Sequence, residues 1–153
     1  MLIATSLVVA QDATPTAMIW LRTDCPLSQN YTRTLSQLQQ KYGDKSVHWK
    51  AVFVNEKAKN VKRFLKKYRL NIPYVLDQNK VLTLRYNATI TPEAILVQNN
   101  KILYQGAIDN QAVALGKFSQ YATQHYLQAA IDSTLAGKAI DIVKTQAIGC
   151  IIE

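Results

Sequence analysis

The chain has 153 residues, of which 48% are hydrophobic and 18% are charged, and its formal net charge is +8. This composition excludes a disordered chain and is typical of one globular domain with an apolar core. No segment is long and apolar enough to predict a membrane span, and no nucleic-acid-binding motif accompanies the positive charge.

The N-terminal residues 1–16 allow two interpretations. Residues 2–10 are apolar, and the small residue Ala10 fits a signal-peptidase site, but no Lys or Arg precedes Arg22. We therefore expect either a signal remnant or an added strand at 1–16, a domain at 17–140 and a C-terminal tail at 141–153. A signal peptide predicts a periplasmic or secreted protein, whereas an added strand predicts a cytoplasmic protein.

Cys25 lies between two patterns of different period. The apolar run at residues 17–21 predicts a short buried strand. Pro26 fits the first position of a helix, whose apolar stripe consists of Leu27, Tyr31, Leu35 and Leu38. The positive end of that helix dipole lowers the pKa of a thiol and favours the nucleophilic thiolate. The alternative is a buried structural cysteine.

The remaining pattern alternates strands and helices before it ends in a hairpin. We expect a turn at 42–44, a strand at 47–54, a helix at 57–69, a short strand at 74–76, a short helix at 81–86, strands at 93–97 and 101–106, and a helix at 123–135. The early alternation predicts parallel strands with helical crossovers, and the late hairpin adds antiparallel strands. The fold class is therefore α/β, with a mixed sheet and helices on both faces.

The helix expected at residues 57–69 is strongly basic on its outer face. Its basic residues are Lys57, Lys59, Lys62, Arg63, Lys66, Lys67 and Arg69. Such a face is either a solvated surface or a docking surface for an acidic redox partner or a membrane.

Several segments together resemble the redoxin branch of the thioredoxin fold. Residues 23–28 (Thr-Asp-Cys-Pro-Leu-Ser) are similar to the Asp-Cys-Pro segments of bacterial redoxin-domain proteins, and residues 91–93 to their threonine–cis-proline turn. Residues 104–110, residues 135–138 and Gly149-Cys150 resemble later parts of the same group. The resemblance implies a thioredoxin-like three-layer α/β/α sandwich with a mixed four- to five-stranded sheet. It also implies a cis Thr91–Pro92 turn against a partly buried Cys25.

Two departures from the resembled families affect the chemistry. Ser28 occupies the second position of the Cys-x-x-Cys pattern, so it can hydrogen-bond the Cys25 sulfur but cannot close a disulfide. A mixed disulfide on Cys25 then needs Cys150 or an external thiol to resolve it. Arg22 stands where the peroxiredoxin pattern requires threonine, which counts against a peroxide site, although its charge favours a thiolate.

The candidate catalytic set is Cys25, Cys150, Thr91, Pro92, Ser28 and Arg22, with no cofactor and no metal. We expect a thiol–disulfide oxidoreductase that acts on a protein disulfide or thiol. A peroxiredoxin-like peroxidase and a non-catalytic thioredoxin-fold binding module are the alternatives. Asp24 opposes thiolate formation at Cys25, but the net pKa is expected roughly one to two units below the free value of about 8.5.

Overall fold

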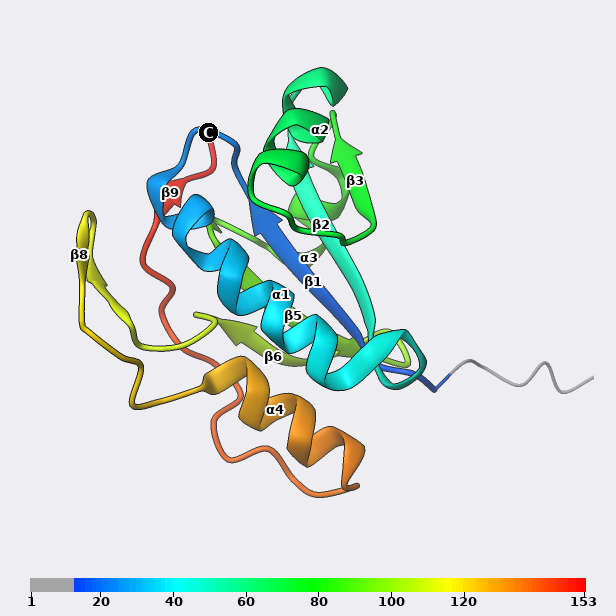
Figure 1. Ribbon diagram of the computed structural model, residues 1–153. Helices are drawn as coiled ribbons and strands as arrows, with labels where there is room; N and C mark the ends of the chain where they lie inside the picture. Colours follow the sequence, from blue (N-terminus) through cyan, green and yellow to red (C-terminus); the bar gives the residue numbers. More distant parts are fainter. Residues whose placement is uncertain (1–12) are drawn as a thin grey trace, which may run out of the picture.

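The computed structural model describes residues 13–153 (Figure 1). In chain order the elements are β1 (Thr16–Leu21), α1 (Pro26–Ser46), β2 (His48–Val54), α2 (Ala58–Lys67), β3 (Tyr74–Asp77), α3 (Val81–Tyr86), β4 (Ile90–Thr91), β5 (Glu93–Gln98), β6 (Lys101–Gly106), β7 (Ala112–Ala114), β8 (Lys117–Phe118), α4 (Tyr126–Leu135) and β9 (Cys150–Ile151). The signal remnant or added strand expected at the N-terminus falls mainly on residues 1–12, outside the described residues.

Five strands form one mixed sheet in the order β3-β2-β1-β5-β6. β1 is parallel to β2 and β2 to β3, whereas β5 is antiparallel to both β1 and β6. β1 is central and covered on both faces, so all its residues after Thr16 are buried. That double burial explains its unbroken apolar sequence.

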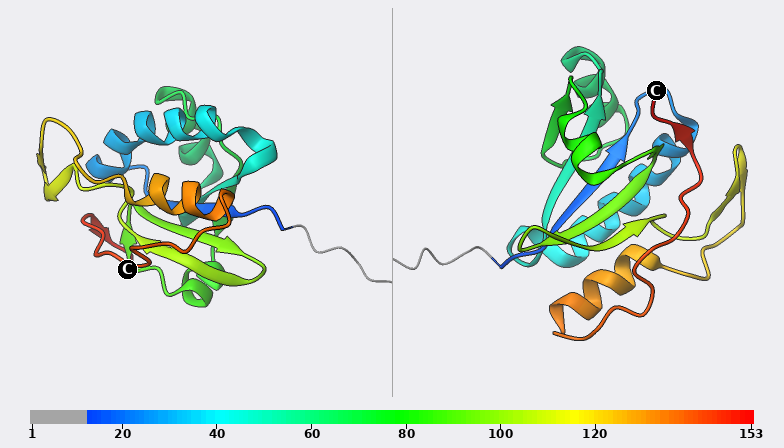
Figure 2. Two further views of the ribbon diagram at one scale, coloured as in Figure 1. Left: turned by 90° about the horizontal axis from the view of Figure 1, so that it is seen from below. Right: turned by 180° about the vertical axis from the view of Figure 1, so that it is seen from behind.

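Helices cover both faces of the sheet (Figure 2). α1, α2 and α4 contribute Leu35, Phe64 and Ile131 to one apolar cluster. α3 packs Leu82 against a second cluster on the opposite face, which contains Trp20. The predicted three-layer α/β/α sandwich with a mixed sheet is therefore confirmed, and the sheet has five strands.

Two predicted helix boundaries differ from the structure by three residues or more. α1 continues to Ser46 across a kink at Gly43, where φ is 65° and ψ is 170°. Glycine adopts this left-handed φ without a steric penalty, so the chain bends there and then resumes a helical turn. α4 begins at Tyr126 instead of residue 123, because the Asn110 side-chain oxygen accepts the backbone N–H groups of Thr123 and Gln124 and holds them in a loop.

The sequence analysis missed two short strand pairs. β7 and β8 form a hairpin that stands away from the sheet (Figure 1). β4 and β9 form an antiparallel pair between the segment before Pro92 and the C-terminal tail. The second pair brings together residues that are far apart in the sequence.

The tail crosses β6 before it reaches β4. Gln105 N–H donates to the Val143 carbonyl at 3.0 Å, and Thr145 N–H donates to the Gln105 carbonyl at 3.1 Å. In β9, Cys150 lies opposite Thr91, and Ile152 N–H donates to the Thr89 carbonyl at 2.9 Å. The tail is thus held to the domain as added strands.

Two glycines permit this close approach of the tail. A Cβ on Gly149 would lie 2.0 Å from the Thr91 carbonyl oxygen, and a Cβ on Gly106 would lie 2.2 Å from Thr145 Oγ1. Any side chain at either position would therefore displace the tail. Within residues 13–153, no helix combines the length and apolar character that a membrane crossing requires.

Candidate active site

Cys25 is the N-cap residue of α1, at the junction that the sequence predicted. Its N–H donates to the Arg22 carbonyl at 3.2 Å, and its carbonyl accepts Gln29 N–H at 3.0 Å. The side chain is 0% exposed, so the expected partial burial is wrong. The docked tail adds the cover that the sequence analysis did not foresee.

Cys150 provides that cover directly. Its Sγ lies 2.6 Å from Cys25 Sγ, and both cysteines are free thiols in this structure. Cys150 is half-buried, and its carbonyl accepts a hydrogen bond from Thr91 Oγ1 at 3.3 Å. The tail therefore brings the two sulfurs into direct contact, with no room for another atom between them.

The Thr91–Pro92 turn packs against the same sulfur. The peptide bond between these residues is cis. Cys25 Sγ donates a hydrogen bond to the Thr91 carbonyl at 3.4 Å. Only the protonated thiol can make this bond, because the thiolate has no proton to donate. Thr91 thus contacts both cysteines, through its carbonyl and through its hydroxyl.

Ser28 and Arg22 have different relations to the sulfurs. Ser28 is fully buried, and its Oγ accepts Arg22 N–H at 3.1 Å, which leaves its own hydroxyl proton for the Cys25 sulfur. The Arg22 side chain instead forms an ion pair with Asp24 at 2.5 Å and reaches the Ile151 carbonyl at 3.5 Å. A hydrogen bond from Arg22 holds the pKa of Asp24 below its usual value. The sequence analysis expected the negative charge of Asp24 to oppose thiolate formation at Cys25. In the structure, the positive charge of Arg22 largely neutralises it.

The environments of the two thiols move their pKa values in opposite directions. Burial raises the pKa of Cys25, but hydrogen bonds from the Cys150 thiol, from the backbone and hydroxyl of Ser28, and from Leu27 N–H bring it below the ordinary value of a thiol. Burial and the adjacent Cys25 sulfur raise the pKa of Cys150 to about 11. Cys25 is therefore the more easily ionised of the two thiols, and Cys150 keeps its proton and donates it to the Cys25 sulfur.

The sequence analysis missed a carboxylate that holds the loop before Cys25. Glu56 accepts Thr23 N–H at 2.9 Å and the Thr23 hydroxyl at 2.6 Å, while Gln29 Nε2 donates to the Thr23 carbonyl at 3.0 Å. Glu56 follows β2, and the Cys25 loop follows the parallel strand β1, so both lie at the same edge of the sheet. The parallel pairing of β1 and β2 was therefore the signal that could have placed Glu56 near the Cys25 loop.

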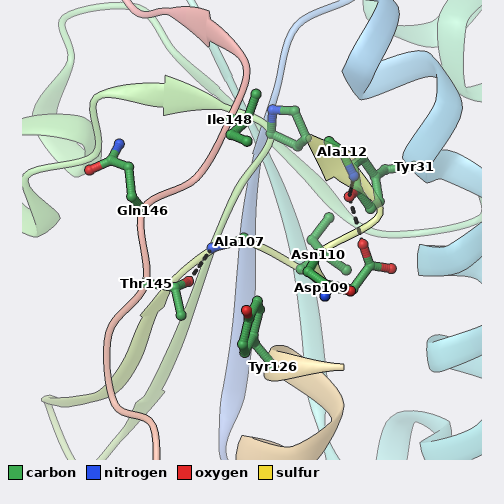
Figure 3. Close-up of a pocket in the computed structure, with 11 residues that line it drawn as sticks. Tyr31, Ala107, Asp109, Asn110, Ala112, Tyr126, Thr145, Gln146 and Ile148 are labelled. Carbon is green, nitrogen blue, oxygen red and sulfur yellow. Dashed lines mark hydrogen bonds between the residues drawn. The ribbon is translucent and has the colours of Figure 1, made fainter. Parts of the chain in front are cut away.

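A cavity of about 210 Å³ lies under the tail beside Pro92 (Figure 3). Thr145 of the tail forms part of its wall, and Tyr31 and Asp109 face it from the domain. Tyr31 donates to Asp109 at 2.6 Å, and burial followed by this bond raises the pKa of Tyr31. Because tail residues close the cavity, release of the tail would open it toward Pro92. Among residues 13–153, no three His, Cys, Asp or Glu side chains are grouped so that they could hold a metal ion.

The sequence model of one family, Redoxin, matches residues 5–124. This chain belongs to the redoxin family. No curated protein matches the chain. The family fits the geometry above, with Cys25 at the start of α1 and a cis-proline turn against its sulfur.

Solved structures extend the resemblance at the level of the fold. An uncharacterised conserved protein from Geobacillus kaustophilus has a TM-score of 0.81 and 22% identity, over 92% of this chain and 77% of that one. A hypothetical protein from Sinorhizobium meliloti 1021 has a TM-score of 0.80 and 23% identity, over 92% and 80% of the two chains. A secreted Mycobacterium tuberculosis disulfide oxidoreductase, described as homologous to E. coli DsbE, has a TM-score of 0.55 and 17% identity, over 82% of each chain.

Proposed function

We propose that this redoxin-family protein is a thiol–disulfide oxidoreductase in which Cys25 is the nucleophile and Cys150 is the resolving thiol. The observation that carries the proposal is the 2.6 Å contact between the two sulfurs at the N-terminus of α1. The opposite pKa shifts of the two thiols support the same division of roles. Fold similarity to a secreted disulfide oxidoreductase agrees with this chemistry.

The exchange takes place in two substitution steps at sulfur. The Cys25 thiolate attacks one sulfur of a substrate disulfide, the substrate S–S bond breaks, and the departing thiolate takes up a proton. Cys150 then loses its proton and attacks the Cys25 sulfur of the mixed disulfide, which releases the second substrate thiol. The substrate gains two electrons and two protons, and the protein ends with a Cys25–Cys150 disulfide. An external dithiol returns the protein to its reduced state by the reverse exchange.

Substrate access requires the tail to move. Cys25 is completely covered while Cys150 is docked, so no substrate sulfur can approach it in this state. Pairing between β9 and β4 involves only two residues in each strand, so few backbone hydrogen bonds oppose release of this end of the tail. The tail therefore alternates between an open form, in which Cys25 reacts, and the docked form, in which Cys150 resolves the intermediate.

The substrate class that we propose is a protein disulfide or thiol, in an oxidising compartment such as the periplasm or the cell exterior. A Cys25–Cys150 bond would persist in such a compartment, whereas cytosolic reductants would remove it. A dedicated peroxidase is a weaker candidate, because Arg22 replaces the expected threonine and its side chain is paired with Asp24. The rate of peroxide consumption, compared with that of a free thiol, tests this alternative.

The test compares the wild type with Cys25→Ser and Cys150→Ser on a peptide that contains one disulfide. The wild type should reduce the peptide over many turnovers when a dithiol reductant is supplied, and Cys25→Ser should lose this activity. Cys150→Ser should accumulate a mixed disulfide between Cys25 and the peptide, visible as a mass increase that a reductant reverses. Equal rates for the wild type and Cys25→Ser would refute the proposal. Undiminished turnover by Cys150→Ser would refute the resolving role alone.

A further inference from the structure

The outer face of α2 and of its flanking residues is an unpaired positive surface, which we call the basic face. Its members are Lys57, Lys59, Lys62, Arg63, Lys66, Lys67 and Arg69, and all seven are exposed. Among residues 13–153, none of them forms an ion pair, since Arg22–Asp24 is the pair that the structure contains. The basic face therefore concentrates positive charge without an internal counter-ion.

The basic face adjoins the Cys25 loop through a cavity of about 260 Å³. Arg63 and Lys67 line it from α2, and Thr23 and Gln29 line it from the active-site side. Thr23 is two residues before Cys25 in the sequence, so the cavity lies beside the reactive sulfur's own loop. A chain bound there would have neighbouring residues within reach of Cys25, because an extended chain advances about 3.3 Å per residue.

Among the described residues, no acidic group near this cavity forms an ion pair with Arg63 or Lys67. Both Glu56 carboxylate oxygens accept hydrogen bonds from Thr23, and Asp24 is paired with Arg22. Arg63 and Lys67 therefore have no counter-ion among the described residues, and the Lys67 ammonium contacts only a neutral ring, with its Nζ 5.2 Å from the Tyr68 ring centroid. Guanidinium and ammonium groups at the mouth of a cavity favour carboxylates, and the guanidinium can bind a carboxylate through two hydrogen bonds.

We propose that the basic face and this cavity bind an acidic segment of the polypeptide that exchanges its disulfide or thiol at Cys25. The inference rests on the proposed function, because the acidic polypeptide that it names is the substrate of the exchange at Cys25. A membrane surface fits less well, because no large apolar side chain is exposed along residues 57–69 to enter the lipid. Attraction of unlike charges raises the rate of encounter and orients the substrate cysteine toward the Cys25 loop.

Binding is measured first, without any chemistry at sulfur. The probe is a fluorescent peptide that contains six Glu residues and a blocked cysteine, and its matched control carries Gln in place of Glu. Fluorescence anisotropy gives the dissociation constants for the wild type, for Arg63→Gln/Lys67→Gln, and for Lys101→Gln/Lys138→Gln. The last variant removes the same charge from exposed residues in β6 and after α4, outside the cavity. Thermal unfolding confirms that all three proteins are folded.

The wild type should bind the Glu peptide at least about tenfold more tightly than the Gln peptide at low ionic strength, with the difference shrinking in high salt. Arg63→Gln/Lys67→Gln should lose most of this preference, and Lys101→Gln/Lys138→Gln should keep it. Equal binding of the two peptides, or equal loss in both variants, would overturn the proposal. So would tighter binding of the wild type to phosphatidylserine vesicles than to the Glu peptide.

A second measurement separates this inference from the proposed function. Disulfide-linked versions of the two peptides and a neutral small disulfide serve as substrates for the wild type and Arg63→Gln/Lys67→Gln. The variant should lower kcat/KM for the acidic peptide and leave the neutral disulfide unaffected. An equal decrease for all three substrates would contradict specific recognition. Activity that does not depend on Cys25 would refute the proposed function, while the anisotropy data would still decide the acidic-segment site.

Discussion

Gly149→Ala is expected to weaken the delivery of Cys150 to Cys25 without altering either sulfur. The new Cβ would lie 2.0 Å from the Thr91 carbonyl oxygen, and ordinary contact begins at 3.4 Å, so β9 must retreat by more than 1 Å. That movement breaks two hydrogen bonds, from Thr91 Oγ1 to the Cys150 carbonyl and from Ile152 N–H to the Thr89 carbonyl. Each contributes about 1 kcal/mol, which gives a loss of about 2 kcal/mol in tail docking.

A loss of this size corresponds to a roughly 30-fold lower effective concentration of Cys150 at Cys25, since 1.4 kcal/mol is a factor of ten. The assay equilibrates the protein in glutathione buffers of graded ratio, traps the thiols with acid and alkylation, and quantifies the Cys25–Cys150 disulfide by mass spectrometry. Gly116→Ala is the matched control, because nothing lies within 4 Å of its added Cβ. If the equilibrium constant for forming the Cys25–Cys150 disulfide in Gly149→Ala lies within twofold of the wild-type value, the role assigned to the Gly149–Thr91 contact is refuted.

Three further substitutions test the electrostatics and the core. Cys150→Ala should raise the pKa of Cys25 relative to Cys150→Ser, because serine keeps a donor to the thiolate; the pH profile of iodoacetamide alkylation measures this. Ser28→Ala on the Cys150→Ser background should shift the same profile upward, and an unchanged midpoint would exclude the Ser28 hydroxyl as a donor. Burial raises the pKa of Asp77, but hydrogen bonds led by the Thr83 hydroxyl lower it below the usual value. The ionised carboxylate therefore stabilises the fold above about pH 4, and this contribution is lost as the pH falls through the lower folded pKa. Asp77→Asn should lower the free energy of unfolding by about 1–3 kcal/mol at pH 7, and urea titrations should show the gap to the wild type narrowing below pH 4.

The position of Cys25 was predictable because every signal for it is local. The apolar run of β1, Pro26 and the stripe through Leu35 lie within about twenty residues of one another and need no knowledge of the rest of the chain. The mixed sheet followed in the same way, from the alternation of strand and helix patterns.

The tail was not predictable, because its contacts join distant segments through very short strands. Cys150 and Thr91 pair across 59 residues, and a two-residue strand has no periodicity to detect. Gly106 and Gly149 were visible in the sequence, but their meaning depends on which backbone lies against them.

The pairing of Arg22 with Asp24 was also missed. The sequence analysis treated these side chains as separate and opposed influences on the Cys25 thiol. In the structure they neutralise one another, and the pKa of Cys25 depends instead on burial, which raises it, and on hydrogen bonds led by that of the Cys150 thiol, which lower it.

Each face of the sheet carries one tryptophan, and this gives the protein a built-in optical probe. Trp20 belongs to the cluster against which Ile152 of the tail packs, whereas Trp49 lies in the cluster under α1. The Trp49 indole N–H has no hydrogen-bond partner among the described residues, so Trp49→Phe removes an unpaired donor and no bond. In that variant, all tryptophan emission comes from Trp20, and a change in this emission is the expected signal when Ile152 leaves or rejoins the Trp20 cluster, without a chemical label.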